Sequence, residues 1–188
     1  MKRGLNLTTT LILAFLFIGG LAFYQFKDNS SEYEKKQNKL EANAVVGKDA
    51  AAKEKEEQTG YIGGVQYDIG IDKNSSQKAV IEVMHKMTHQ KVKAAEKWGA
   101  IPMIPDTINQ VYNIVKNSHF ELKDDLLGIL KKWKKGDFEE IAEDHNYFWQ
   151  HQGGTIGKAY GKMTKTEEET FILNNFGDEV AKEVNAKP

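Results

Sequence analysis

The chain has 188 residues, 26 basic and 27 acidic side chains, a formal net charge of −1 and no cysteine. A chain of this length suits one domain with appendages. The near balance of charge argues against nucleic acid as a partner, because phosphate binding needs a basic surplus on one face. The lack of cysteine excludes disulfide bonds and a lipidated cysteine anchor, so the fold relies on packing.

Residues 1–26 predict an N-terminal membrane anchor. Lys2 and Arg3 are the only charges there, and they precede the apolar run LILAFLFIGGLAFY. With its flanks, this run covers 7–26, and at about 1.5 Å per helical residue it spans roughly the 30 Å of bilayer hydrocarbon. The positive-inside rule then keeps the N-terminus in the cytoplasm. We therefore expect a single-pass membrane protein whose domain lies outside the cell membrane.

A cleaved signal peptide is the alternative interpretation of the same segment, and it predicts secretion. Gly20 and Ala22 supply small residues before a cut at Phe23. However, no Ala-x-Ala motif stands there, and Tyr24 and Phe26 prolong the apolar run. We therefore favour an uncleaved anchor.

The remaining chain divides into a linker, a domain and a tail. Residues 27–60 mix Lys and Glu with Ala, Asn and Ser, and they hold too little apolar surface to offset the entropy of ordering. We interpret them as a disordered, charged stalk. The domain is expected at 61–177, where 61–72 alternates in the manner of a short strand or extended lead-in, and 178–188 is a polar tail.

The periodicity of the domain predicts an all-α fold, a small bundle of about five helices. The first helix is expected at 75–98, where Met84, Met87 and Trp98 fall in one apolar arc at 100° per residue. Three further helices are expected: one carrying Ile108 to Val115, one at 121–136, and one at 137–152 that begins with an Asp137/Glu140 capping box. A last helix is expected to be capped by Thr164 or Thr166, with Glu167 or Glu169 three residues later, and to end at Gly177.

The segment VMHKMTHQKVKAAEKWG raises the question of a metal site. His85 and His89 are four residues apart, a spacing that lets two imidazoles reach one zinc ion, and Glu82 or Glu96 could add a carboxylate. Lys86 stands where zincin proteases carry their catalytic Glu, so a peptidase is excluded. We favour a solvated polar face with Glu82 paired to Lys86 and no cofactor, with zinc as the weaker alternative.

The same histidines also suit the rim of a protein interface, because they border the apolar arc. The following loop, GAIPMIPD, carries apolar residues that we expect to be exposed and available for contact. The expected interface residues are His85, His89, Trp98, Ile101, Met103 and Ile104. The expected partner is another envelope protein or a second copy of the chain.

A hydrolase is the alternative function. Asp144 and His145 could form an acid–base pair, and His145 could join His85 and His89 if the two helices bring them together. Against this, the chain has no cysteine and no serine in a nucleophile elbow. We favour the simpler interpretation that His145 is a half-buried core residue bonded to the backbone or to a neighbouring carboxylate.

The glycine-rich segment GGTIGKAYG does not match a phosphate-binding loop. Ala159 stands after Lys158, where that loop requires Ser or Thr, so no nucleotide cofactor is expected. Gly153, Gly157 and Gly161 indicate instead close backbone packing or a loop that needs positive φ.

Three segments together carry a family resemblance: VMHKMTHQKVKAAEKWG, LKKWKKGDF and DHNYFWQHQGGTIGKAYG. Their order and spacing, over about residues 75–173, resemble a family of small uncharacterised proteins of Gram-positive bacteria that have an N-terminal hydrophobic segment and a domain of unknown function. The resemblance implies the same membrane location but no activity, substrate or catalytic residue. The predicted function is thus that of a membrane-anchored domain that binds another protein or itself.

Overall fold

The computed structural model describes residues 36, 39 and 47–185. The predicted anchor at 7–26 lies outside these residues, and among the helices that are described none is both long and apolar enough to cross a membrane. The chain divides into two compact units, 1–53 and 54–188. The second unit, which contains everything discussed below, begins inside the range that we assigned to the linker.

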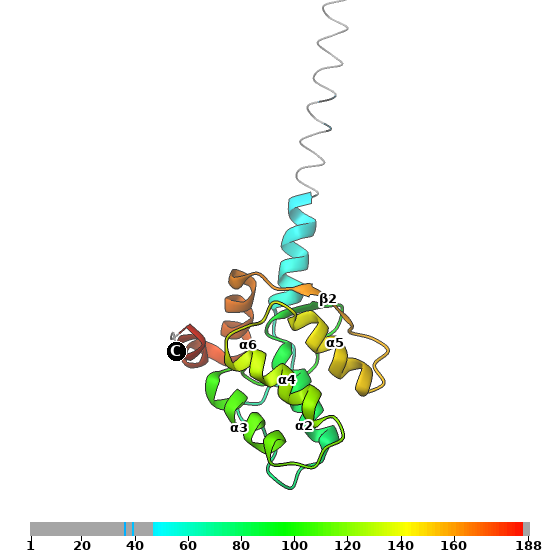
Figure 1. Cartoon of the computed structure of the whole chain (residues 1–188). Coiled ribbons are helices and arrows are strands. Elements are labelled where there is room, and N and C mark those ends of the chain that lie inside the picture. The colour runs from blue at the N-terminus through cyan, green and yellow to red at the C-terminus, as the bar shows by residue number, and fades with distance from the viewer. Residues whose placement is uncertain (1–35, 37–38, 40–46, 186–188) are drawn as a thin grey trace, which may run out of the picture. The chain divides into compact units, whose positions relative to one another are not determined.

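The described part of the second unit is mainly helical, as the periodicity predicted, and it also contains a small antiparallel sheet that the periodicity did not predict (Figure 1). After a helical segment that ends at residue 59, the elements are α2 (Gln77–Thr88), β1 (Val92–Ala94), α3 (Pro105–Lys116), α4 (Lys123–Lys134), α5 (Ile141–His151), β2 (Ala159–Lys162) and α6 (Lys165–Asn185).

The first predicted helix is too long at its C-terminal end. Instead of running over 75–98, α2 ends at Thr88, and the chain turns so that the Lys91 N–H donates to the Thr88 carbonyl at 2.9 Å. The chain then enters β1, which pairs with β2. Backbone hydrogen bonds to a partner strand outweigh the helical preference of this stretch, which is rich in Lys, Ala and Glu. This is a tertiary effect that a helical wheel does not detect.

Trp98 is consequently not buried with Met84 and Met87, although the sequence placed all three in one apolar arc. It follows β1 in an irregular segment, and 72% of its surface is exposed. Met84 and Met87, which remain inside α2, are buried as predicted.

The core is formed mainly by α2 to α5, with α2 packed against α5 and α3 against α4. Ile101, Met103 and Ile104 are buried, so the expectation of an exposed contact loop is wrong. The reason is that the loop between β1 and α3 crosses the core, where the buried Gln90 side chain accepts a hydrogen bond from the Met103 N–H at 2.8 Å.

One of the two predicted capping boxes forms. The Thr164 hydroxyl accepts from the Glu167 N–H at 3.3 Å, and the Glu167 carboxylate accepts from the Thr164 N–H at 2.7 Å. The predicted Asp137/Glu140 capping box does not form, because α5 begins only after Glu140. Asp137 instead belongs to the end of α4, where its N–H donates to the Lys132 carbonyl at 3.1 Å.

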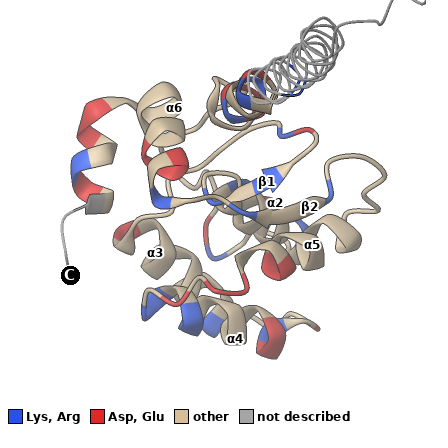
Figure 2. Ribbon diagram, turned by 90° about the horizontal axis from the view of Figure 1, so that it is seen from above, with Lys and Arg blue, Asp and Glu red and all other residues tan. Residues whose placement is uncertain are grey.

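A second, smaller cluster lies under α6 and contains Phe171, Ile172 and Phe176. Gly177 bends the helix at a φ of 78°, as its predicted role as a terminator requires, but helical residues resume after it. Figure 2 shows acidic and basic residues distributed over several helices, with basic residues gathered at one end of α4.

Candidate metal centre

Three histidines come together where α2 packs against α5. His85 lies on α2, His89 is the residue that caps the C-terminal end of α2, and His145 lies on α5. One ring nitrogen of each lies within 4.8 Å of those of the other two, the only such group of three ligands in the part of the chain that the structure describes. His85 Nε2 and His145 Nε2 are the closest recorded pair, at 2.9 Å. The two helices therefore converge as the hydrolase alternative required.

These histidines are not a solvated surface face, so the favoured interpretation is wrong for them, although the Glu82–Lys86 pair that it predicted does form. His89 is 4% exposed, His145 is completely buried, and only His85 is partly exposed. The sector of α2 beside the apolar arc faces α5 instead of water, which a single helix cannot reveal.

The other nitrogen of His89 is bound to the backbone. Its Nδ1 lies 2.5 Å from the Gly99 carbonyl oxygen. A carbonyl only accepts hydrogen bonds, so Nδ1 carries the proton and the Nε2 lone pair of the neutral ring is free for a metal. Gly99 itself has a φ of 75°, and its N–H donates to the Gly63 carbonyl at 3.1 Å, which holds the acceptor in place.

The tautomer of His145 is set in a similar way. Its Nδ1 lies 3.2 Å from Asn146 Oδ1. The orientation of that amide is determined by β2, because Oδ1 accepts from the Ala159 N–H at 2.8 Å and Nδ2 donates to the Ala159 carbonyl at 2.9 Å. His145 Nδ1 is therefore the donor, and its Nε2 carries a lone pair.

The third ring completes the pattern. His85 Nδ1 lies 2.6 Å from Gln152 Oε1, an arrangement in which His85 donates and its Nε2 is also left with a lone pair. Two lone pairs that face each other at 2.9 Å repel unless a cation or a proton lies between them. Two imidazoles on one tetrahedral zinc ion are about 3.3 Å apart, given bonds of about 2.0–2.1 Å, so the spacing is close to that of a metal site.

The protonation behaviour of the cluster favours the metal-binding form. Burial lowers the pKa of His85, lowers that of His89 well below its ordinary value and lowers that of His145 to about 4. Repulsion between neighbouring imidazoles adds to the effect for His89 and His145. The rings are therefore neutral at pH 7, which is the state that binds transition metals.

Two predicted site residues have other roles. Glu82, expected as the third ligand, lies outside the cluster and forms an ion pair with Lys86 at 2.8 Å. Asp144, expected to pair with His145, is buried and instead accepts hydrogen bonds from Trp133 Nε1 and Lys132 Nζ, each at 2.8 Å. The carboxylate of Asp144 is thus part of the packing between α4 and α5.

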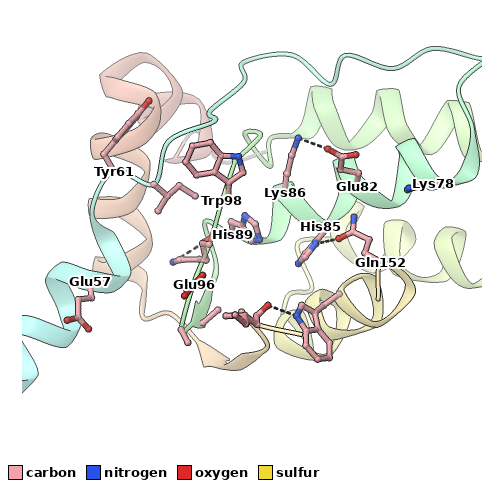
Figure 3. A pocket seen from close by; sticks show the side chains of 17 residues that line it. Glu57, Tyr61, Lys78, Glu82, His85, Lys86, His89, Glu96, Trp98 and Gln152 are labelled. Atoms are coloured by element: carbon pink, nitrogen blue, oxygen red, sulfur yellow. Dashed lines mark hydrogen bonds and ion pairs between the residues drawn. The ribbon is translucent and has the colours of Figure 1, made fainter. Parts of the chain in front are cut away.

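A pocket of about 740 Å³ opens beside the cluster (Figure 3). His85 and His89 line it, and the figure shows Gln152 reaching toward His85, with Trp98 near His89. Lys97 also contributes to the lining. A metal held by the three histidines would thus lie next to a space that admits a ligand.

Lys97 forms hydrogen bonds with the backbone of three segments around this pocket. Its Nζ donates to the carbonyls of Gln58 at 2.8 Å, Val92 at 3.2 Å and His89 at 3.4 Å. Burial lowers the pKa of Lys97 to about 7. Since three backbone carbonyls use its donors, Lys97 joins the segment ending at residue 59, α2 and β1 rather than offering a free charge.

The residues that orient the histidines, Gly99, Asn146 and Gln152, were not identified from the sequence. The position of Asn146 next to His145 is only a weak indication that it orients the ring. Nothing in the local sequence connects Gln152 with His85, which is 67 positions away.

Comparison with known proteins places the site within a family region. Residues 84–173 match the sequence model of a family described as "Family of unknown function (DUF6241)". This range contains all three histidines and is close to the range of the predicted resemblance to an uncharacterised family. No curated protein and no solved structure matches the chain.

Proposed function

We propose that the domain binds a transition-metal ion, with Zn²⁺ as the reference ion, through His85, His89 and His145. The observation that carries the proposal is the convergence of three imidazoles, two of them buried and one partly exposed, whose outer nitrogens contact oxygen acceptors. Imidazole suits Zn²⁺ and its neighbours in the first transition row, and it does not suit Mg²⁺ or Ca²⁺. Three protein ligands leave a fourth position open, which is typical of zinc sites that act on a ligand and atypical of structural ones.

The test is zinc titration by calorimetry on the full chain, solubilised in a mild detergent and stripped with EDTA. We expect one zinc ion per chain, and Co²⁺ in its place should give the visible absorption of a four-coordinate site. His89→Ala and His145→Ala should abolish binding. His119→Ala is the matched control, because His119 is exposed and lies outside the cluster.

Two results would contradict the proposal of a metal site. One is the absence of zinc binding by a folded wild-type chain. The other is retention of full affinity in both cluster variants, since the ion would then be held elsewhere.

A second candidate function is metal-dependent hydrolysis, favoured by the open coordination position beside a pocket. A bound zinc ion lowers the pKa of its water to near 7, and Glu82 and Glu96 line the same pocket. The test is hydrolysis of p-nitrophenyl acetate by the zinc-loaded chain and by His89→Ala. Equal rates for the two proteins would remove this candidate.

We also propose that the domain is displayed outside the cell membrane on the anchor at 7–26, with the charged N-terminus inside. The support is the order of positive charge and apolar run in the sequence. Protease added to protoplasts should remove the domain; full protection would contradict the proposal. Binding to an envelope protein or to a second copy stays a prediction, to be tested by crosslinking in intact cells.

A further inference from the structure

We propose that the pocket beside the histidine cluster binds an uncharged saccharide, with one sugar ring stacked on Trp98 and an oxygen of the same ligand on the metal's open position. The stacking part stands on Trp98 and the pocket lining alone. The oxygen contact rests on the proposed metal function, and the two parts are tested separately below.

Trp98 is an aromatic platform held rigidly in an exposed position. The indole lies against the backbone of Gly63 and Gly64, where an added Cβ would come within 2.7 Å and 3.1 Å of the ring. Both glycines have positive φ, so this backbone accommodates the ring and tolerates few other residues. Trp98 lines the pocket and is 72% exposed, so it offers a large aromatic surface to a ligand.

The surroundings of Trp98 combine apolar and hydrogen-bonding groups. Tyr61 and Ile156, both largely exposed, line the same pocket, as do Glu96 and Gln152. A pyranose ring presents C–H groups on its faces and hydroxyl groups around its edge. An aromatic surface with polar side chains beside it complements both features, and the volume of about 740 Å³ is within the range of small-molecule sites.

The charge of the pocket favours a neutral ligand. Lys86 is paired with Glu82 at 2.8 Å, and the donors of Lys97 are used by backbone carbonyls. Lys78 is a third cation in the lining, and the three lysines are matched in number by the carboxylates of Glu57, Glu82 and Glu96. The pocket therefore lacks the positive surplus that a phosphate ligand needs.

An extended peptide is disfavoured by the state of the neighbouring strand. β1 pairs with β2 on one side. On its other side the buried Gln58 side chain mimics a strand, accepting from the Ala94 N–H and donating to the Ala94 carbonyl, each at 3.0 Å. β1 therefore offers no open edge at Ala94 to which a peptide could add by backbone pairing.

The experiment uses the zinc-loaded full chain in detergent and the β-1,4-linked tetramer of N-acetylglucosamine, whose acetamide oxygens are metal-binding groups. Calorimetry should show binding that Trp98→Ala weakens at least tenfold and Trp98→Phe weakens less. Tyr160→Ala is the control, an exposed aromatic outside the pocket, and should bind as wild type. Zinc affinity, measured on each variant, should be unchanged, because Trp98 is not a ligand.

The outcomes separate the two parts. The β-1,4-linked tetramer of glucose is tested as a second saccharide. The saccharide proposal is overturned, even if zinc binds, when neither tetramer binds or when Trp98→Ala binds the saccharide as strongly as the wild type. Saccharide binding of equal strength after EDTA treatment overturns the oxygen contact with the metal and leaves stacking on Trp98 supported. Absence of zinc binding together with Trp98-dependent saccharide binding refutes the proposed metal function alone.

Discussion

At the residue scale, the histidine cluster is defined by the atoms that contact its outer nitrogens. The Gly99 carbonyl and the Asn146 amide are fixed by backbone hydrogen bonds, so they impose one tautomer on His89 and His145. Gln152 differs, because its amide can turn around. In one orientation it accepts from His85 and leaves three lone pairs for a metal; in the other it donates, and His85 can share a proton with His145.

Gln152→Ala should therefore weaken zinc binding by about 10- to 100-fold, the usual effect of removing a group that orients a metal-ligating histidine. Gln152 is exposed and its recorded side-chain contact is with His85, so the free energy of unfolding without metal should change little. Calorimetry and urea denaturation measure the two quantities.

The matched control for this prediction is Gln150→Ala, another exposed glutamine at the same end of α5. An equal loss of zinc affinity in both variants would show that the effect is not specific to the contact with His85.

At the scale of elements, the loop between α5 and β2 builds one wall of the pocket. Gly154 lies under the Trp149 ring, whose Nε1 donates to the Ile156 carbonyl at 2.8 Å. Gly157, with a φ of 87°, comes so close to the Glu96 carbonyl that an added Cβ would lie at 2.6 Å. Of the three glycines named from the sequence, Gly157 packs closely at positive φ, Gly153 has positive φ in open space, and Gly161 does neither. The segment follows directly after Gln152.

Gly154→Ala should lower the free energy of unfolding by about 1–3 kcal/mol, the usual cost of overpacking, because the new Cβ would lie 2.3 Å from the Trp149 ring. It should also weaken zinc binding by displacing the loop that follows Gln152. Urea denaturation measures the first effect and calorimetry the second.

Gly161→Ala is the control in the same region, since nothing lies within 4 Å of its added Cβ and its φ is not positive. If the Gly154 variant is as stable as the Gly161 variant, the close contact with Trp149 does not constrain the loop.

At the scale of the whole molecule, burying three neutral histidines links stability to pH. The pKa of His145 is about 4 in the fold, against an ordinary value near 6.5, and burial also lowers the pKa of His89 well below normal. The unfolded chain therefore binds more protons than the folded chain below pH 6.5. Of the charged groups nearby, Glu82 raises the pKa of His85, Lys86 lowers it, and Lys97 lowers those of the other two rings.

The metal-free protein should accordingly lose stability as the pH falls from 6.5 toward 4, by up to about 1.4 kcal/mol per pH unit for each histidine that stays neutral. Urea denaturation of the EDTA-treated chain at pH 7, 6 and 5 measures this slope. His145→Asn should show a shallower slope. A free energy of unfolding that is constant between pH 6.5 and 5 would contradict the burial of neutral rings.

The sequence by itself determined the mainly helical class, the burial of Met84 and Met87, and the cap of α6 at Thr164, because each depends on residues within a few turns of one helix. It also named His85, His89 and His145 as candidates in its weaker alternatives, together with Glu82 and Asp144. It did not determine β1, whose formation depends on β2, about 65 positions further along the chain.

Only the tertiary structure decided that the three histidines form one buried cluster. His85 and His145 are 60 positions apart, and their contact depends on how α2 packs against α5. The same packing turned the expected contact loop into core and left Trp98 exposed on its glycine support. Local periodicity records which face of a helix is apolar, but it carries no information about which element covers the adjoining polar sector, and here that element supplied the third histidine.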